Sequence, residues 1–156
     1  MAPSDQATVL LVDDQARIRQ VQRLALERAG YLVTEATSGY KAIALFGEGQ
    51  RFDVLIADIG MPGMSGVEMA FTIRTTHPDQ KILYVTGQLD RLMKARPLWE
   101  GEAFLEKPFS IRGLREAVSL LLYGTKKKPS LVEPLPKSIR QPRRAQHQSR
   151  PKGKIW

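Results

Sequence analysis

Short aliphatic runs alternate with longer amphipathic segments over the first 124 residues. Five such runs occupy residues 8–12, 32–36, 54–57, 82–85 and 103–105. Runs that are apolar throughout are typical of strands buried on both faces, as in a parallel sheet covered by helices on both sides. The alternation therefore predicts an α/β fold, a doubly wound (βα)5 unit with a five-stranded parallel sheet.

The segments between the runs predict helices. The apolar residues of the first segment, 15–29, recur at spacings of three or four: Ile18, Val21, Ala25 and Ala29. Its arginines at 17, 19, 23 and 28 can then reach water on the opposite face. Gly30 suits the left-handed conformation that often follows a helix.

Serines are placed to begin three later helices, because a serine side chain can accept a hydrogen bond from a free amide of the first turn. Ser38 and Ser110 each precede an amphipathic segment, and Ser65 or Gly66 opens another. Pro97 interrupts the remaining segment, 88–100, and proline in a helix interior costs roughly 3 kcal/mol. We expect that fourth helix to be short, kinked or irregular.

The net charge of +8 is concentrated in the last 32 residues. Residues 125–156 contain ten Lys or Arg, five of the ten prolines and one acid, Glu133, whereas residues 1–124 carry a net charge of −1. The apolar residues of this tail follow no helical or strand period, so we expect it to be disordered or extended. The sequence thus predicts a globular domain over 1–124 and a basic, proline-rich tail over 125–156.

Polar side chains follow four of the predicted strands. Asp13 and Asp14 come after the first, Asp58 after the third, Thr86 after the fourth and Lys107 after the fifth. Ligands of open parallel sheets bind beyond the carboxyl ends of the strands, near the point where strand order reverses. We therefore expect three carboxylates, a hydroxyl and an amine to meet at one edge.

Three clustered carboxylates repel one another unless a cation neutralises them, and an oxygen-only ligand set suits Mg²⁺. A lysine opposite them would add positive charge, and a small hydroxyl can donate to a phosphoryl oxygen. One aspartate could then act as a nucleophile and form an acyl phosphate. The residues thus indicate magnesium-assisted phosphoryl chemistry.

At this point the sequence resembles the receiver domain of two-component response regulators. The resemblance covers about residues 8–123 and is carried by four motifs in the family's order: VLLVDD at 9–14, DIGMPGMSG at 58–66, VTG at 85–87 and FLEKPF at 104–109. It implies a flavodoxin-like receiver fold. The segment before Phe104 is about one residue shorter than is usual in the family.

The resemblance also implies residue roles. Asp58 would accept a phosphoryl group from the phosphohistidine of a sensor histidine kinase or phosphotransfer protein. Mg²⁺ would be held by Asp13, Asp14, Asp58 and the backbone carbonyl of Gly60, and Lys107 would pair with the phosphoryl group. Because Gly60 has no side chain, we expect a site open to water.

Two further residues would transmit the signal, according to the same resemblance. On phosphorylation Thr86 would move toward the phosphoryl group and Phe104 would rotate inward, changing the surface that contacts a downstream protein target. The leading hypothesis is a cytoplasmic single-domain signalling switch that is not a turnover enzyme.

Two other functional classes remain open. The receiver could control exposure of the basic tail to nucleic acid or an acidic partner, with Lys126–128 and Arg143 and Arg144 contacting phosphates. A phosphohydrolase using the same aspartate chemistry is disfavoured, because no inserted cap or substrate pocket is visible. The absence of cysteine excludes disulfides and thiolate zinc sites, and neither a signal peptide nor a membrane span is expected.

Overall fold

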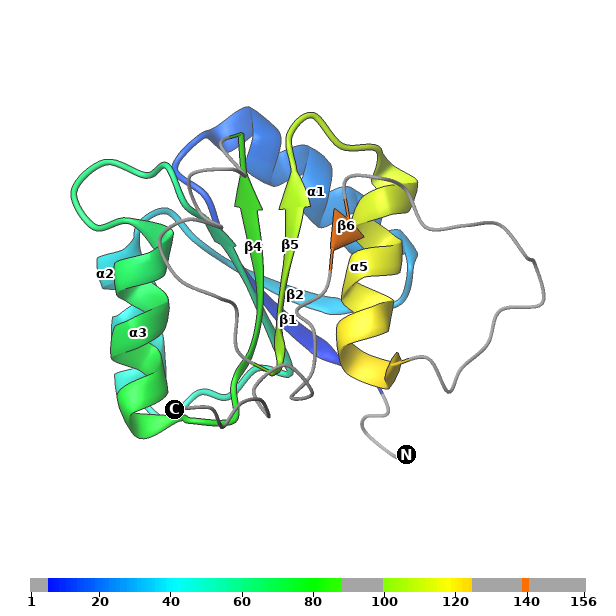
Figure 1. Ribbon diagram of the computed structural model, residues 1–156. Coiled ribbons are helices and arrows are strands. Elements are labelled where there is room, and N and C mark those ends of the chain that lie inside the picture. Colours follow the sequence, from blue (N-terminus) through cyan, green and yellow to red (C-terminus); the bar gives the residue numbers. More distant parts are fainter. Residues whose placement is uncertain (1–5, 88–99, 125–138, 141–156) are drawn as a thin grey trace, which may run out of the picture.

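The computed structural model describes residues 6–87, 100–124 and 139–140 (Figure 1). Five parallel strands form the sheet: β1 (Thr8–Val12), β2 (Leu32–Ala36), β3 (Val54–Asp58), β4 (Lys81–Thr86) and β5 (Glu102–Glu106). Within these described residues four helices accompany the strands: α1 (Ala16–Arg28), α2 (Gly39–Gly47), α3 (Gly66–Thr76) and α5 (Ile111–Tyr123). The α/β class and all five predicted strands are confirmed, with strand ends differing by at most one residue.

Strand order places the ends of β1 and β3 side by side. The sheet runs β2-β1-β3-β4-β5-β6, so the chain moves outward from β1 to β2 and then crosses back to β3. In Figure 1, α2 and α3 lie on one face of the sheet and α1 and α5 on the other. Each face buries its own apolar cluster, so the strands are held rigidly from both sides.

Serine caps fix where three helices begin, as predicted. The hydroxyl of Ser38 accepts from the amide of Lys41 at 3.2 Å, and that of Ser110 accepts from Gly113 at 2.9 Å. Ser65 forms a reciprocal capping box with Glu68, in which each side chain accepts from the other residue's amide at 3.1 Å.

The buried stripe of α1 differs from the predicted one. Gln22, Ala25 and Leu26 are buried, whereas Val21 is 55% exposed. Arg19, expected to reach water, is only 13% exposed and pairs with Glu35 of β2 at 2.7 Å. The helix is rotated by about one position because Leu26, the larger apolar side chain, occupies the cluster between α1 and the sheet.

The sheet has a sixth strand that the sequence did not predict. β6 (Ile139–Arg140) comes from the basic tail and pairs antiparallel with β5. The expected disorder of 125–156 otherwise falls on residues outside the described ranges, as does the expected fourth helix apart from Glu100. Within the described ranges, no helix combines the length and apolar character needed to cross a bilayer.

Candidate functional site

Three carboxylates meet where β1 and β3 end. Asp13 directly follows β1, and Asp58 is the last residue of β3, which pairs with β1 in parallel register. One oxygen from each of Asp13, Asp14 and Asp58 lies within 4.8 Å of the others. Asp13 and Asp58 are 1% and 5% exposed, whereas Asp14 faces solvent. The predicted acidic cluster is therefore present, with two buried members and one open side.

Asp13 is the most buried carboxylate of the cluster. Its Oδ1 accepts a hydrogen bond from the amide of Gln15 at 2.9 Å, while its buried Oδ2 has no partner among the described residues. Burial raises the pKa of Asp13 above its ordinary value, an effect that the Gln15 amide opposes. The charge of Asp58 raises this pKa further, Lys107 lowers it, and Asp14 adds a smaller increase.

Asp58 receives two donors at one of its oxygens. The amide of Gly60 donates to Oδ1 at 3.2 Å, and the ammonium group of Lys107 lies 3.4 Å from the same atom. Lys107 is positioned from its backbone, because its amide donates to the carbonyl of Thr86 at 2.8 Å. The lysine therefore reaches from beyond β5 to the end of β3, as the sequence predicted.

Of the expected switch residues, Thr86 lies beside this site, directly after Val85, which pairs with Asp58, and Phe104 lies farther along the sheet. Thr86 is the last residue of β4 and is 4% exposed, and Phe104, in the middle of β5, is 1% exposed. Phe104 lies opposite Tyr84 in the sheet register, and Tyr84 is two residues before Thr86. Because strand residues two apart share a face, a continuous line runs from Thr86 through Tyr84 to Phe104 on one face of the sheet.

Two glycines shape the surroundings of Asp58 in opposite ways. A Cβ at Gly60 would meet nothing within 4 Å, which agrees with the expected opening to water. A Cβ at Gly66, in contrast, would lie 2.6 Å from the carbonyl oxygen of Asp58. Sequence reasoning gave Gly66 only a capping role, yet its missing side chain lets α3 begin directly against the backbone of Asp58.

The donor set fits a hard divalent cation such as Mg²⁺, which prefers oxygen ligands and keeps several waters. The open side at Asp14 leaves room for those waters. The unpartnered, buried Oδ2 of Asp13 supplies an independent sign of fit, because a buried carboxylate oxygen without a partner is destabilising unless something binds it.

A buried carboxylate on β5 was missed by sequence reasoning. Glu102 is 0% exposed, accepts from the hydroxyl of Tyr84 at 3.0 Å and lies 3.8 Å from a guanidinium nitrogen of Arg74. It lies at the start of β5 on the same face as Phe104. No sequence signal marks it, because an acid before an aliphatic run is usually exposed.

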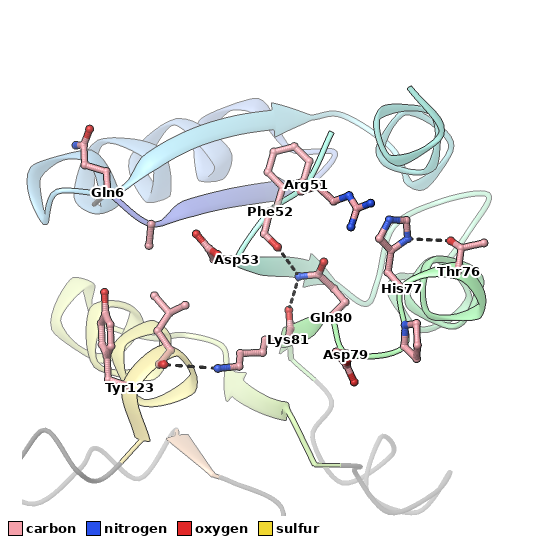
Figure 2. A pocket seen from close by; sticks show the side chains of 13 residues that line it. Gln6, Arg51, Phe52, Asp53, Thr76, His77, Asp79, Gln80, Lys81 and Tyr123 are labelled. Atoms are coloured by element: carbon pink, nitrogen blue, oxygen red, sulfur yellow. Dashed lines mark hydrogen bonds between the residues drawn. The ribbon is translucent and has the colours of Figure 1, made fainter. Parts of the chain in front are cut away.

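A cavity lies at the opposite end of the sheet (Figure 2). It has a volume of about 750 Å³ and is bordered by the residues that precede β3 and begin β4, including Asp53, Gln80 and Lys81. The amide group of Gln80 donates to the carbonyls of Phe52 and Lys81, both at 3.1 Å. None of the residues that line the cavity belongs to the carboxylate cluster, so the two sites are separate.

Comparison with known proteins gives a consistent result. Residues 9–119 match the family described as response regulator receiver domain. The chain is 34% identical over 115 residues to the response regulator receiver protein CpdR of Brucella abortus, covering 73% of this chain and 95% of CpdR. It is also 38% identical over 121 residues to the sensor kinase CckA of the same species, covering 76% of this chain but only 13% of the kinase.

A solved structure supports the same assignment of fold. The response regulator protein TrrA of Thermotoga maritima, determined in complex with Mg²⁺ and BeF, is 33% identical and superposes with a TM-score of 0.63. The match covers 75% of this chain and all of TrrA.

Proposed function

This chain belongs to the response regulator receiver domain family of two-component signalling, and we propose that it accepts a phosphoryl group on Asp58. The observation that carries the assignment is the position of the Asp58 carboxylate, 3.4 Å from the ammonium group of Lys107 and inside the acidic cluster with Asp13 and Asp14. The receiver corresponds to residues 1–124, and the basic tail to 125–156.

The reaction is a transfer to a carboxylate oxygen. An oxygen of Asp58 attacks the phosphorus of a phosphohistidine, and the phosphorus–nitrogen bond breaks as the imidazole keeps the electron pair. The product is an acyl phosphate on Asp58 and a free histidine on the donor. Lys107 contributes positive charge opposite the phosphoryl oxygens, and the hydroxyl of Thr86 can donate to one of them.

Mg²⁺ would be held by Asp13, Asp14, Asp58 and the backbone carbonyl of Gly60. The bound ion supplies positive charge that offsets the phosphoryl group as it approaches three carboxylates. The pairing of the Asp13 Oδ1 with the Gln15 amide leaves the buried Oδ2 available for this role.

Phosphorylation would be communicated through Thr86 and Phe104. Thr86 turns toward the phosphoryl group, and this changes the packing between the ends of β4 and β5. Phe104 then occupies the inward position. The surface beside β5 then presents a different shape to a downstream protein. The described line of Thr86, Tyr84 and Phe104 on one face of the sheet supports this route.

The partners follow from the chemistry. The donor is a sensor histidine kinase or a phosphotransfer protein, and the product is a signal rather than a released metabolite, so the chain is not a turnover enzyme. The cytoplasm remains the expected compartment. Nucleic-acid binding through 125–156 stays an alternative prediction, since the structure describes only Ile139–Arg140 of that segment.

Intact-protein mass after incubation with acetyl phosphate and Mg²⁺ tests the proposal. The wild type should gain the mass of one phosphoryl group, and this gain should be lost in Asp58→Asn and after chelation of Mg²⁺. Asp79→Asn, which removes an exposed carboxylate at the opposite end of the sheet, is the matched control and should be phosphorylated like the wild type. Equal phosphorylation of Asp58→Asn would refute the assignment.

A further inference from the structure

The outer edge of β5 is occupied by a strand from the basic tail. β5 would otherwise end the parallel sheet on this side, and an edge strand exposes backbone N–H and C=O groups that can pair with another chain segment. In the structure β6 (Ile139–Arg140) takes this place in antiparallel orientation, and Figure 1 shows it beside β5. The occupant of the edge is therefore identified.

The register places this added strand at the switch residue. Arg140 lies opposite Phe104, and Ile139 lies opposite Leu105. On its other side β5 pairs with β4, where Phe104 lies opposite Tyr84. The backbone of Phe104 is thus held between two strands, one from the receiver sheet and one from the tail.

The sequence around β6 limits how the tail can pair. Proline cannot donate to a strand ladder, and Pro136 and Pro142 bracket residues 137–141. Within the described residues the pairing comprises Ile139 and Arg140, and a flanking proline could join it only with its nitrogen turned away from β5. The docked strand is therefore short.

Chain length allows the strand to come from the same molecule. The 14 residues at 125–138 can span up to about 45 Å when extended. The 13 residues of α5 extend over about 20 Å, so the connection is long enough to return from Gly124 to β5. Residues in the tail are present at high local concentration near this edge, which favours self-docking over pairing with a second copy.

We propose that Ile139–Arg140 is a docking strand for the edge of β5, and that its docking and the phosphorylation of Asp58 favour each other. The sign follows from Phe104, which is 1% exposed while β6 is paired. This inward position is the one that the proposed function assigns to the phosphorylated protein, so the coupling rests on that function. Thermodynamic linkage makes this coupling reciprocal. Docking of β6 shifts the equilibrium toward the phosphorylated state by the same factor by which phosphorylation shifts the equilibrium toward the docked strand.

Docking is tested first, by amide hydrogen exchange of the full chain at β5. The variant carries Ile139→Pro and Arg140→Pro, which remove both amide donors of the strand. The matched control carries Arg144→Pro and Ala145→Pro, which also removes one arginine and adds two prolines but leaves Ile139–Arg140 intact. Exchange over residues 102–106 should be several-fold faster in the variant than in the wild type and the control.

Equal exchange in all three proteins would overturn docking. Protection that disappears on dilution would also overturn it, because the strand would then come from a second copy of the chain. Neither result depends on phosphorylation. A failure of docking would therefore leave the proposed function of Asp58 untouched.

Coupling is tested by the affinity for beryllofluoride in the presence of Mg²⁺, since this anion imitates a phosphoryl group on a carboxylate. The variant should bind about fivefold more weakly than the wild type, and the control should match the wild type. Lost protection at β5 with unchanged beryllofluoride affinity would overturn the coupling. A wild type that binds no beryllofluoride and takes no phosphoryl group would refute the proposed function and the coupling together, while leaving the exchange result valid.

Discussion

Replacing Asp13 with asparagine should stabilise the protein when no divalent cation is present. The buried oxygens of Asp13 and Asp58 lie within 4.8 Å of each other. Two unit charges at that distance repel by about 3.5 kcal/mol at an effective dielectric constant of 20 and by about 1 kcal/mol in bulk water. Lys107, 3.4 Å from Asp58, offsets part of this repulsion. We expect Asp13→Asn to raise the free energy of unfolding by about 1–2 kcal/mol.

Asparagine keeps the other interactions of Asp13. Its carbonyl oxygen can still accept from the amide of Gln15, now 2.9 Å from Oδ1, and its NH2 group replaces the unpartnered Oδ2 with a donor facing acidic oxygens. The substitution therefore removes a buried charge without removing volume. The stabilisation measures the repulsion and not a change in packing.

The assay is chemical denaturation at neutral pH with EDTA and again with Mg²⁺. In EDTA the variant should unfold at higher denaturant concentration than the wild type. With Mg²⁺ the difference in denaturation midpoint between the variant and the wild type should become smaller or change sign, because the wild type gains stability from the ion and the variant gains little. Asp79→Asn, remote from the cluster, should respond to Mg²⁺ like the wild type.

The pH dependence has a defined sign. Asp13 titrates at its ordinary pKa of 3.8 when unfolded, and its pKa is raised in the folded protein, chiefly by burial. The folded state therefore binds a proton at Asp13 more readily than the unfolded state does. As the pH rises from 3.8 through the raised pKa, the charged carboxylate lowers the free energy of unfolding. The advantage of Asp13→Asn in EDTA should be full at neutral pH and shrink toward pH 3.8. A variant less stable than the wild type in EDTA at neutral pH would refute the reasoning.

Three further substitutions probe contacts around the site. Gly66→Ala would place a Cβ 2.6 Å from the carbonyl oxygen of Asp58, so we expect a loss of about 1–3 kcal/mol in urea denaturation and slower phosphorylation by acetyl phosphate. Ser65→Ala removes the side-chain cap of α3 and should cost about 1 kcal/mol in the same assay; no loss would show that the cap is replaced by water. Glu102→Ala removes the buried acceptor of the Tyr84 hydroxyl and the carboxylate 3.8 Å from Arg74, and should lower the free energy of unfolding by about 1–3 kcal/mol, whereas a neutral effect would contradict a stabilising role of these contacts.

The elements that the sequence predicted best are those whose patterns depend on neighbours along the chain. Four of the predicted runs became strands that are buried on both faces, β1, β3, β4 and β5, because such burial requires continuous apolar side chains, whereas β2 lies at the sheet edge and is only partly buried. The proximity of the carboxylates at 13, 14 and 58 could be predicted from the sequence, because parallel strands end at the same edge of the sheet. Ser38 and Ser110 could be identified as caps from the segments that follow them.

The features that sequence reasoning missed depend on three-dimensional packing. β6 has only two residues, too few for any period, and its pairing is determined by the free edge of β5. The buried stripe of α1 includes Gln22, a polar residue that a pattern of apolar positions leaves out. The close approach at Gly66 is set by where α3 meets the backbone of Asp58, which no local rule describes.

The charges at the site favour transfer in the presence of a cation. Lys107 is one positive charge against three carboxylates, so the cluster retains excess negative charge before any phosphoryl group arrives. A phosphoryl donor adds more negative charge at Asp58, where the two available donors both approach Oδ1. Because one lysine offsets only part of this charge, we predict that a divalent cation held by the three carboxylates would make transfer more favourable. The rate of phosphorylation by acetyl phosphate should therefore saturate with Mg²⁺ concentration at a fixed donor concentration, and substantial phosphorylation in excess chelator would contradict this prediction.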